Sequence, residues 1–118
     1  MYHISAKSQE NVIGIHIERQ LGVKDTQTLL PFLEMCIKKH GSIRVLGDLK
    51  DFKGIEFLGL LKVLLFVFRY RSRLDKKIVI TDQKWVKNWV QFLSPFFKTD
   101  IQCFPKEKIE EAWEWVSK

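Results

Sequence analysis

One stretch of this chain restricts its possible folds more than any other. It is the run FLGLLKVLLFVF from Phe57 to Phe68, which is apolar except at Gly59 and Lys62. As a helix it would be only ~18 Å long, too short for a ~30 Å bilayer, so we expect no transmembrane segment. A surface helix of a small domain normally carries one apolar stripe, whereas an all-apolar helix must be covered on more than one side. The cover could be the chain's own sheet and helices, a second copy, a membrane surface or an apolar ligand.

The composition predicts a single globular domain over residues 1–118. The chain has 118 residues, of which 46% are hydrophobic and 29% charged, and a domain of this size can bury a core of its own. Cys36 and Cys103 are too few for a disulfide framework, and the N-terminus lacks an apolar secretory signal, so we expect a cytoplasmic protein. The net charge of +6 can attract phosphate-bearing partners, although it can equally serve solubility.

Short alternating segments and longer helical stripes follow one another along the chain. Val12–Ile17 alternates as a half-buried strand does, and Tyr2–Ala6 can pair with it as an antiparallel hairpin. Further strands are expected at 43–49, 76–81 and 100–104, and helices at about 25–40, 56–70, 82–93 and 109–116. This order predicts an α/β fold with a mixed, mostly parallel sheet. Right-handed crossovers would place the helices mainly on one face.

Local signals refine these boundaries. Asp25 or Thr26 is expected to cap the first helix, Pro31 to kink or restart it, and Asp82 to cap the third helix. The segment at 50–54 is expected to be a loop. Trp115 lies off the apolar stripe of the closing helix, so we expect it to be exposed aromatic surface.

The chemistry-bearing residues predict a non-enzymatic protein without catalytic residues, cofactor or metal. His3, His16 and His40 share no metal-ligand spacing, and both cysteines are expected to act as small hydrophobes. Phosphate-binding and nucleophile-elbow motifs are absent from the sequence.

Carboxylates gather after the strand at 43–49. A turn and a helix start favour acids there in any case, which accounts for Asp48, Asp51 and Glu56 without a function. The alternative is an anion-binding or enzymatic pocket near Asp48, Asp51 and Lys53, because ligands often bind at this edge of a parallel sheet.

A basic stretch at 69–77 follows the apolar helix. Its arginines and Tyr70 could clamp phosphates and stack on a base, or they could meet anionic lipid headgroups. Cations also accumulate at helix C-termini because of the helix dipole. Nucleic-acid binding is therefore an alternative and not the preferred function. The cations are Arg69, Arg71, Arg73, Lys76 and Lys77.

With its elements in this order, the chain resembles the SpoIIAA-like family of small bacterial STAS-type domains, whose fold is also compared with CRAL-TRIO lipid-binding domains. The segments that carry the resemblance are LLPFLEMCIKKHGSIRVLGDLKDFKG (29–54), the apolar helix with its basic residues, KKIVITDQKWVKNW (76–89), PFF (95–97) and CFPKEKIEEAWEWV (103–116). The resemblance implies a sequentially wound sheet with helices mainly on one side and no established catalytic residues.

The sequence departs from that family at one functional position. STAS anti-sigma-factor antagonists carry a phosphorylatable serine in a DSSGL-type string at a helix N-terminus. The matching residues here are Glu56-Phe57-Leu58-Gly59-Leu60, so a leucine without a hydroxyl stands at the serine position. The resemblance therefore does not extend to a phosphoserine switch.

We predict a binding module that acts through its apolar helix. The predicted partner is a second copy of the chain in a homodimer, another protein, or a lipid-like ligand. Acidic groups of that partner would meet Arg69, Arg71 and Arg73 at the rim of the contact. The predicted contact residues are Phe57, Leu61, Leu64, Leu65 and Phe68.

Overall fold

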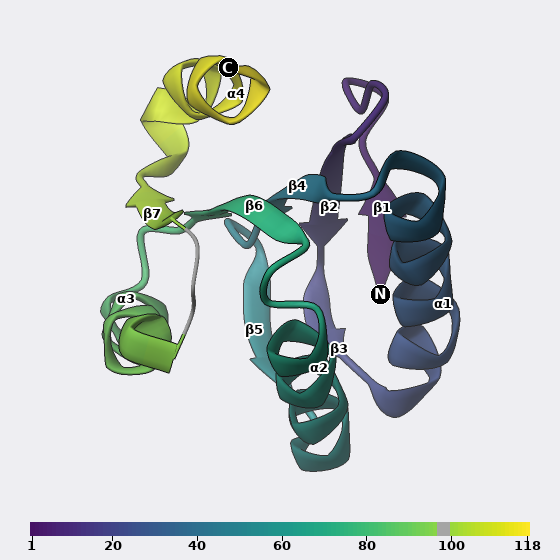
Figure 1. Ribbon diagram of the computed structural model, residues 1–118. Helices are drawn as coiled ribbons and strands as arrows, with labels where there is room; N and C mark the ends of the chain where they lie inside the picture. Colours follow the sequence, from purple (N-terminus) through teal and green to yellow (C-terminus); the bar gives the residue numbers. More distant parts are fainter. Residues whose placement is uncertain (97–99) are drawn as a thin grey trace.

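A five-stranded sheet forms the centre of the computed structural model, which describes residues 1–96 and 100–118 (Figure 1). In spatial order its strands are β1 (Tyr2–Ile4), β2 (Val12–Ile17), β4 (Ile43–Asp48), β6 (Leu74–Ile80) and β7 (Asp100–Phe104). β1 is antiparallel to β2, and every other neighbouring pair is parallel. The predicted mixed, mostly parallel sheet with its N-terminal hairpin is therefore confirmed.

Four α-helices cover the two faces of this sheet unequally. α1 (Val23–His40), α2 (Phe57–Arg69) and α3 (Lys84–Leu93) pack on one face, whereas α4 (Ile109–Ser117) packs on the other. In Figure 1, α4 accordingly lies on the opposite side of β6 from α2 and α3. Single 3₁₀ turns at Ser94–Phe96 and Lys106–Lys108 follow α3 and precede α4. The predicted bias of the helices toward one face is confirmed.

The alternation of the strands divides the core in two. Ile13 and Ile15 of β2 pack with Phe66 of α2 and with the inner side of α1. Val12, which points to the other face of the same strand, packs with Val116 of α4. This division follows from the pleat, because successive strand residues point to opposite faces of a sheet.

A second, two-stranded sheet was not predicted from the sequence. β3 (Arg19–Leu21) pairs in parallel with β5 (Phe52–Ile55), so the prediction of a loop at 50–54 was wrong in its second half. The register shifts after Arg19, which has a φ of 55° in the left-handed region. Leu21 and Phe52 are both buried with Val86 of α3, so packing beneath a helix accounts for these short strands.

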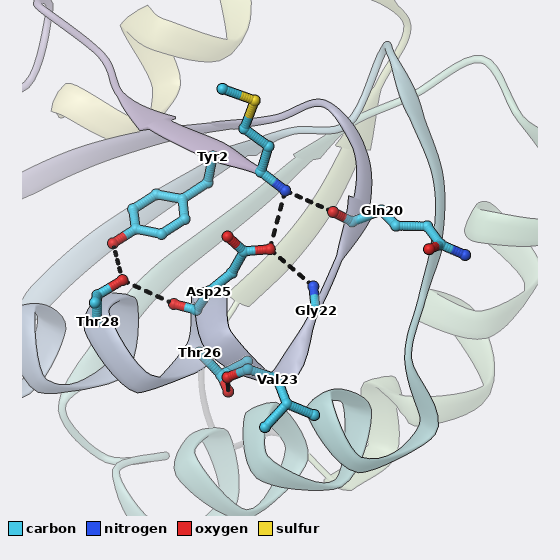
Figure 2. Close-up of polar contacts among 8 residues, drawn as sticks. Tyr2, Gln20, Gly22, Val23, Asp25, Thr26 and Thr28 are labelled. Atoms are coloured by element: carbon cyan, nitrogen blue, oxygen red, sulfur yellow. Dashed lines mark hydrogen bonds and ion pairs between the residues drawn. The ribbon is translucent and has the colours of Figure 1, made fainter.

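The first helix begins earlier than predicted, and Figure 2 shows the contacts that define its start. The Asp25 carboxylate accepts a hydrogen bond from the Gly22 N–H (2.8 Å) and another from the Met1 ammonium (2.9 Å). Gly22 is therefore the N-cap, and Asp25 supports it from within the first turn, as does Thr26 by donating to the Val23 carbonyl oxygen. Burial alone would raise the pKa of Asp25, but the two hydrogen bonds stabilise its ionised form and leave the pKa lowered.

Two other local predictions were wrong. α1 continues through Pro31 as one helix. Pro31 and Gln27, whose carbonyl oxygen loses its intrahelical partner, are both exposed, so water can satisfy that oxygen. Asp82 does not cap α3, whose N-cap is Gln83, and instead lies 3.9 Å from the ammonium of Lys106.

The absence of a side chain at Gly14 leaves room for the Trp113 ring of helix α4. A Cβ added to Gly14 would stand 2.4 Å from Cη2 of Trp113, closer than any real contact allows. Trp115 is half-buried against the core beneath α4, and the Lys76 ammonium lies 4.7 Å from its ring centroid. Trp115 is therefore not the open aromatic surface that its position in the sequence suggested.

Candidate functional site: the exposed face of α2

Helix α2 is held along its inner side. Gly59 lies against the backbone of Leu21 and Gly22, and Phe66 is buried in the core beside α1. The Tyr70 hydroxyl, just past the end of the helix, donates a 2.7 Å hydrogen bond to Glu34 of α1. These contacts fix which side of α2 faces outward.

The outer side of α2 is apolar and open to solvent. Four of its residues recur at i, i+4, i+8 and i+11, which places them on one side of a helix, and Leu58 lies next to them. We call this set the α2 stripe; its relative exposures are Phe57 70%, Leu58 61%, Leu61 40%, Leu65 68% and Phe68 58%. Leu64, which was also predicted as a contact residue, is half-buried. The chain therefore does not enclose its most apolar helix.

The three arginines predicted at the rim of this surface point to two different places. The Arg71 guanidinium lies 4.3 Å from the ring centroid of Phe68 and donates to the Phe68 carbonyl oxygen (2.8 Å). Arg69 is exposed in the last turn of α2. Arg73 instead donates to the carbonyl oxygen of Gly41 at the end of α1 (2.8 Å). Arg69 and Arg71 thus lie at the end of the α2 stripe, whereas Arg73 contacts the C-terminal end of α1.

The remaining cations of the basic stretch face elsewhere. Lys76 donates to the Trp115 carbonyl oxygen (2.9 Å) on the α4 side of the sheet. Lys77 is buried and donates to the Leu74 carbonyl oxygen (3.2 Å). Because neighbouring strand residues alternate, β6 divides these cations between its two faces. The stretch at 69–77 therefore does not form one continuous cationic surface.

A charged hydrogen bond joins α2 to α1. Hydrogen bonds from Tyr70 and Lys38 lower the pKa of Glu34, and the same carboxylate raises the pKa of the Tyr70 hydroxyl. Both shifts arise because the hydrogen bond at the end of α2 pairs an ionised carboxylate with a protonated phenol.

Sequence reasoning missed a second exposed apolar set, on α3. Its members recur at i, i+4 and i+7, and we call them the α3 ridge: Trp85 (42% exposed), Trp89 (49%) and Phe92 (69%). A signal was present, because α3 also carries Val86 and Val90, which pack inward. A short helix with two apolar sets cannot bury both against one sheet.

Polar side chains gather where β2 and β4 end. Nδ1 of His16 lies 3.2 Å from Oδ2 of Asp48, and its Nε2 lies 3.3 Å from Oδ2 of Asp51 and 3.5 Å from Oε1 of Glu18. Both aspartates of the predicted alternative site are thus engaged by one histidine. Beside them opens a cleft of about 560 Å³, lined by Glu18, Arg19, Lys50, Asp51, Phe52, Lys53 and Gln83.

The described parts of the chain contain no cluster of potential metal ligands, and both cysteine thiols are half-buried. Within residues 1–96 and 100–118, no three His, Cys, Asp or Glu side chains are arranged to hold a metal ion. Burial raises the pKa of the Cys36 and Cys103 thiols, which makes them poor nucleophiles. None of the helices described here combines the length and apolar character needed to cross a bilayer.

The strand order, the antiparallel first strand and the helices mainly on one face define a STAS-type α/β fold, which in general serves protein interaction. The family model for SpoIIAA-like proteins matches residues 12–117, and the chain therefore belongs to the SpoIIAA-like family. The predicted family resemblance is confirmed. Phe97, in the PFF segment of that resemblance, lies outside the described residues.

Solved structures with the same fold are distant in sequence. An uncharacterised protein with a SpoIIAA-like fold from Shewanella loihica PV-4 superposes with a TM-score of 0.82 at 16% identity, covering 98% of this chain and 93% of that one. The anti-sigma factor antagonist SpoIIAA in its unphosphorylated form gives 0.75 at 12% identity, covering 99% and 98%. The phosphorylated form of the Bacillus cell fate determinant SpoIIAA gives 0.68 at 11% identity, covering 96% and 99%. No curated protein matches the sequence.

Proposed function

We propose that this chain is a cytoplasmic, non-enzymatic association module whose α2 stripe contacts a protein or lipid-like partner. One observation carries the proposal: five large apolar side chains on one helix are 40% or more exposed. Isolated exposed hydrophobic residues are ordinary, but a continuous apolar patch on a small domain marks a contact surface. Leu58 stands at the start of α2 without a hydroxyl, so we propose that this association is not regulated by phosphorylation at that position.

The proposal predicts that the α2 stripe controls what the purified chain associates with. Light scattering reports association between copies, and extraction followed by mass spectrometry reports bound lipid. The double substitution Leu61→Gln and Leu65→Gln should abolish whichever association the wild-type chain shows, because it removes two exposed apolar side chains and leaves the core intact.

Met35→Gln is the matched control, because Met35 is 60% exposed on α1 and lies outside the α2 stripe. It should associate as the wild type does. A wild-type chain that stays monomeric, carries no extractable lipid and does not adsorb to vesicles would contradict the proposal.

A second candidate function, the binding of a small anion, is supported by the cleft at the ends of β2 and β4. Its lining includes Arg19, Lys50 and Lys53, and among the described residues neither Arg19 nor Lys53 forms an ion pair. Arg19 also has the left-handed φ described above, and such residues often cluster at ligand sites.

This candidate predicts that inorganic phosphate, titrated into the protein and followed by amide chemical shifts, moves resonances around the cleft. The double substitution Arg19→Ala and Lys53→Ala should remove the response, whereas Lys118→Ala should not. Shifts that are absent at millimolar phosphate, or that persist in the double variant, would exclude the cleft as an anion site.

A further inference from the structure

We propose that the cleft at the ends of β2 and β4, here called the anion cleft, takes a small tetrahedral dianion such as sulfate or phosphate, and that a proton bound by His16 promotes this binding. The inference rests on the second candidate function, because it concerns the same cleft. It goes beyond that function by assigning a role to a residue behind the cleft and by making the affinity for the anion depend on pH.

The first observation is that both ring nitrogens of His16 face carboxylates. Nδ1 lies 3.2 Å from Oδ2 of Asp48, which is also 3.7 Å from the ammonium of Lys50. Nε2 lies 3.3 Å from Oδ2 of Asp51 and 3.5 Å from Oε1 of Glu18. A neutral imidazole has one N–H and donates on one side of the ring only, whereas an imidazolium donates on both sides. The arrangement therefore suits the protonated ring.

The second observation is that the carboxylates on the Nε2 side belong to the wall of the anion cleft. Glu18 and Asp51 line the cleft, and His16 is not among the described residues that do so. The side chain of His16 is 22% exposed and that of Asp51 is 59% exposed, so the histidine lies behind the carboxylate. The Arg19 N–H donates a 3.0 Å hydrogen bond to the carbonyl oxygen of Asp51, which keeps the two segments of the wall side by side. His16 therefore acts on the cleft through these carboxylates and not by touching the anion.

The third observation is the charge of the cleft lining. Its three cations are opposed by the two carboxylates that contact His16. A proton on His16 places a positive charge beside both carboxylates, so their repulsion of an entering dianion decreases. Imidazole is the side chain that ordinarily changes its charge between about pH 5 and pH 8, which brings this effect into the physiological range.

The other charged groups around His16 come from β1, the hairpin and α4. His3 of β1 stacks on His16 with ring centroids 6.4 Å apart, and its Nε2 lies 3.7 Å from the carboxylate of Glu18. Lys7 lines a pocket beneath α4 that also includes His16, and its ammonium pairs with Glu110 at 3.3 Å. His3→Gln should weaken the pH dependence less than His16→Gln does, because it leaves the contacts of the His16 ring nitrogens in place.

The test is a titration of the full chain with sulfate at constant ionic strength, followed by amide chemical shifts around the cleft at about pH 8 and about pH 5.5. Sulfate is the probe because it keeps its double charge across this range, whereas phosphate changes its charge within it. The wild-type chain should bind sulfate at least about fivefold more tightly at the lower pH. By linkage, calorimetry near neutral pH in two buffers of different ionisation enthalpy should show that sulfate binding takes up protons.

Two variants test the roles of the histidine and of the carboxylate. His16→Gln should bind sulfate weakly at both pH values, whereas the control His40→Gln, at the exposed end of α1, should keep the pH difference. Asp51→Asn should bind sulfate more tightly than the wild type at the higher pH. Its control is Asp75→Asn, because Asp75 accepts a 2.6 Å hydrogen bond from Ser42 at the N-terminal end of β6, away from the cleft. Unfolding cannot produce a gain in affinity, so Asp51→Asn is informative even if His16→Gln does not fold.

Equal sulfate affinity at both pH values, a pH difference that persists in His16→Gln, or no gain in Asp51→Asn would overturn the inference. In each of these cases the anion site itself stands, provided that phosphate or sulfate still moves resonances around the cleft. If neither anion moves them at either pH, in the wild type or in Asp51→Asn, the inference and the second candidate function both fail.

Discussion

At the scale of single residues, the position of α4 depends on the missing side chain at Gly14. The indole of Trp113 occupies the space that a Cβ would need, with Cη2 at 2.4 Å and Cζ2 at 2.7 Å from it. Both atoms belong to the rigid indole ring of a half-buried residue that packs against the core, so the ring or the helix that carries it must shift to admit a Cβ.

We therefore expect Gly14→Ala to destabilise the protein by roughly 1–3 kcal/mol, as overpacking of a core does. Gly47→Ala is the control, because the atom nearest to an added Cβ there is 3.7 Å away, an ordinary contact. Urea unfolding of both variants measures the difference. Equal losses of stability at the two glycines would show that the Trp113 contact has no energetic role.

Single-residue predictions from the sequence succeeded where a residue's role is local and failed where it depends on a distant partner. Val12–Ile17 forms a strand as predicted, but its burial does not alternate, because helices cover both faces and bury its first four residues. Asp82 is a good helix cap by residue type, but Lys106 lies beside it. Trp115 lies off its helical stripe, yet the chain brings Lys76 over its ring. Neither partner could be identified from spacing along the chain.

At the scale of elements, the hydrogen bond between Tyr70 and Glu34 joins the C-terminal end of α2 to α1. The pKa of Glu34 is lower in the folded chain than in the unfolded chain. The ionised Glu34 therefore stabilises the fold fully at a pH above its unfolded pKa, and this stabilisation is lost as the pH falls through its folded pKa. The pKa of Tyr70 is raised, so its contribution is present below its ordinary value and is lost as the pH rises through the folded pKa.

Tyr70→Phe is consequently expected to reduce stability most near neutral pH and to lose its effect in acid. Urea unfolding of the wild type and the variant across this range measures the difference. Tyr2→Phe is the control, because the Tyr2 hydroxyl pairs with the neutral hydroxyl of Thr28 (2.6 Å) and its loss should not depend on pH in this range. A Tyr70→Phe effect that is equal at neutral and acidic pH would contradict the assigned pairing.

The helices α1 and α4 were predictable because apolar residues recur in them at helical spacing. The pair β3 and β5 was not, because strands of three and four residues are too short to show alternation and are buried by a helix that comes much later in the chain. The exposed apolar surface of α2 could be predicted, because the sequence of this helix has no polar face. The α3 ridge was missed because tryptophan at helical spacing usually belongs to a core, although the second apolar set of Val86 and Val90 on the same helix was a signal for it.

At the scale of the whole molecule, the central sheet separates two surfaces of different character. One side presents α2 and α3, with exposed apolar side chains and cations, and the other presents α4, whose first turn is acidic. Lysines lie on the α4 side too, among them Lys76, so the two surfaces differ more in exposed apolar side chains than in charge.

Because α2 and α3 carry Lys62, Arg69, Lys84 and Lys87 and no carboxylate, a negatively charged body that approaches these two helices would be attracted without repulsion from the helices themselves. Encounters on this side of the protein would therefore be faster at low ionic strength than at high ionic strength.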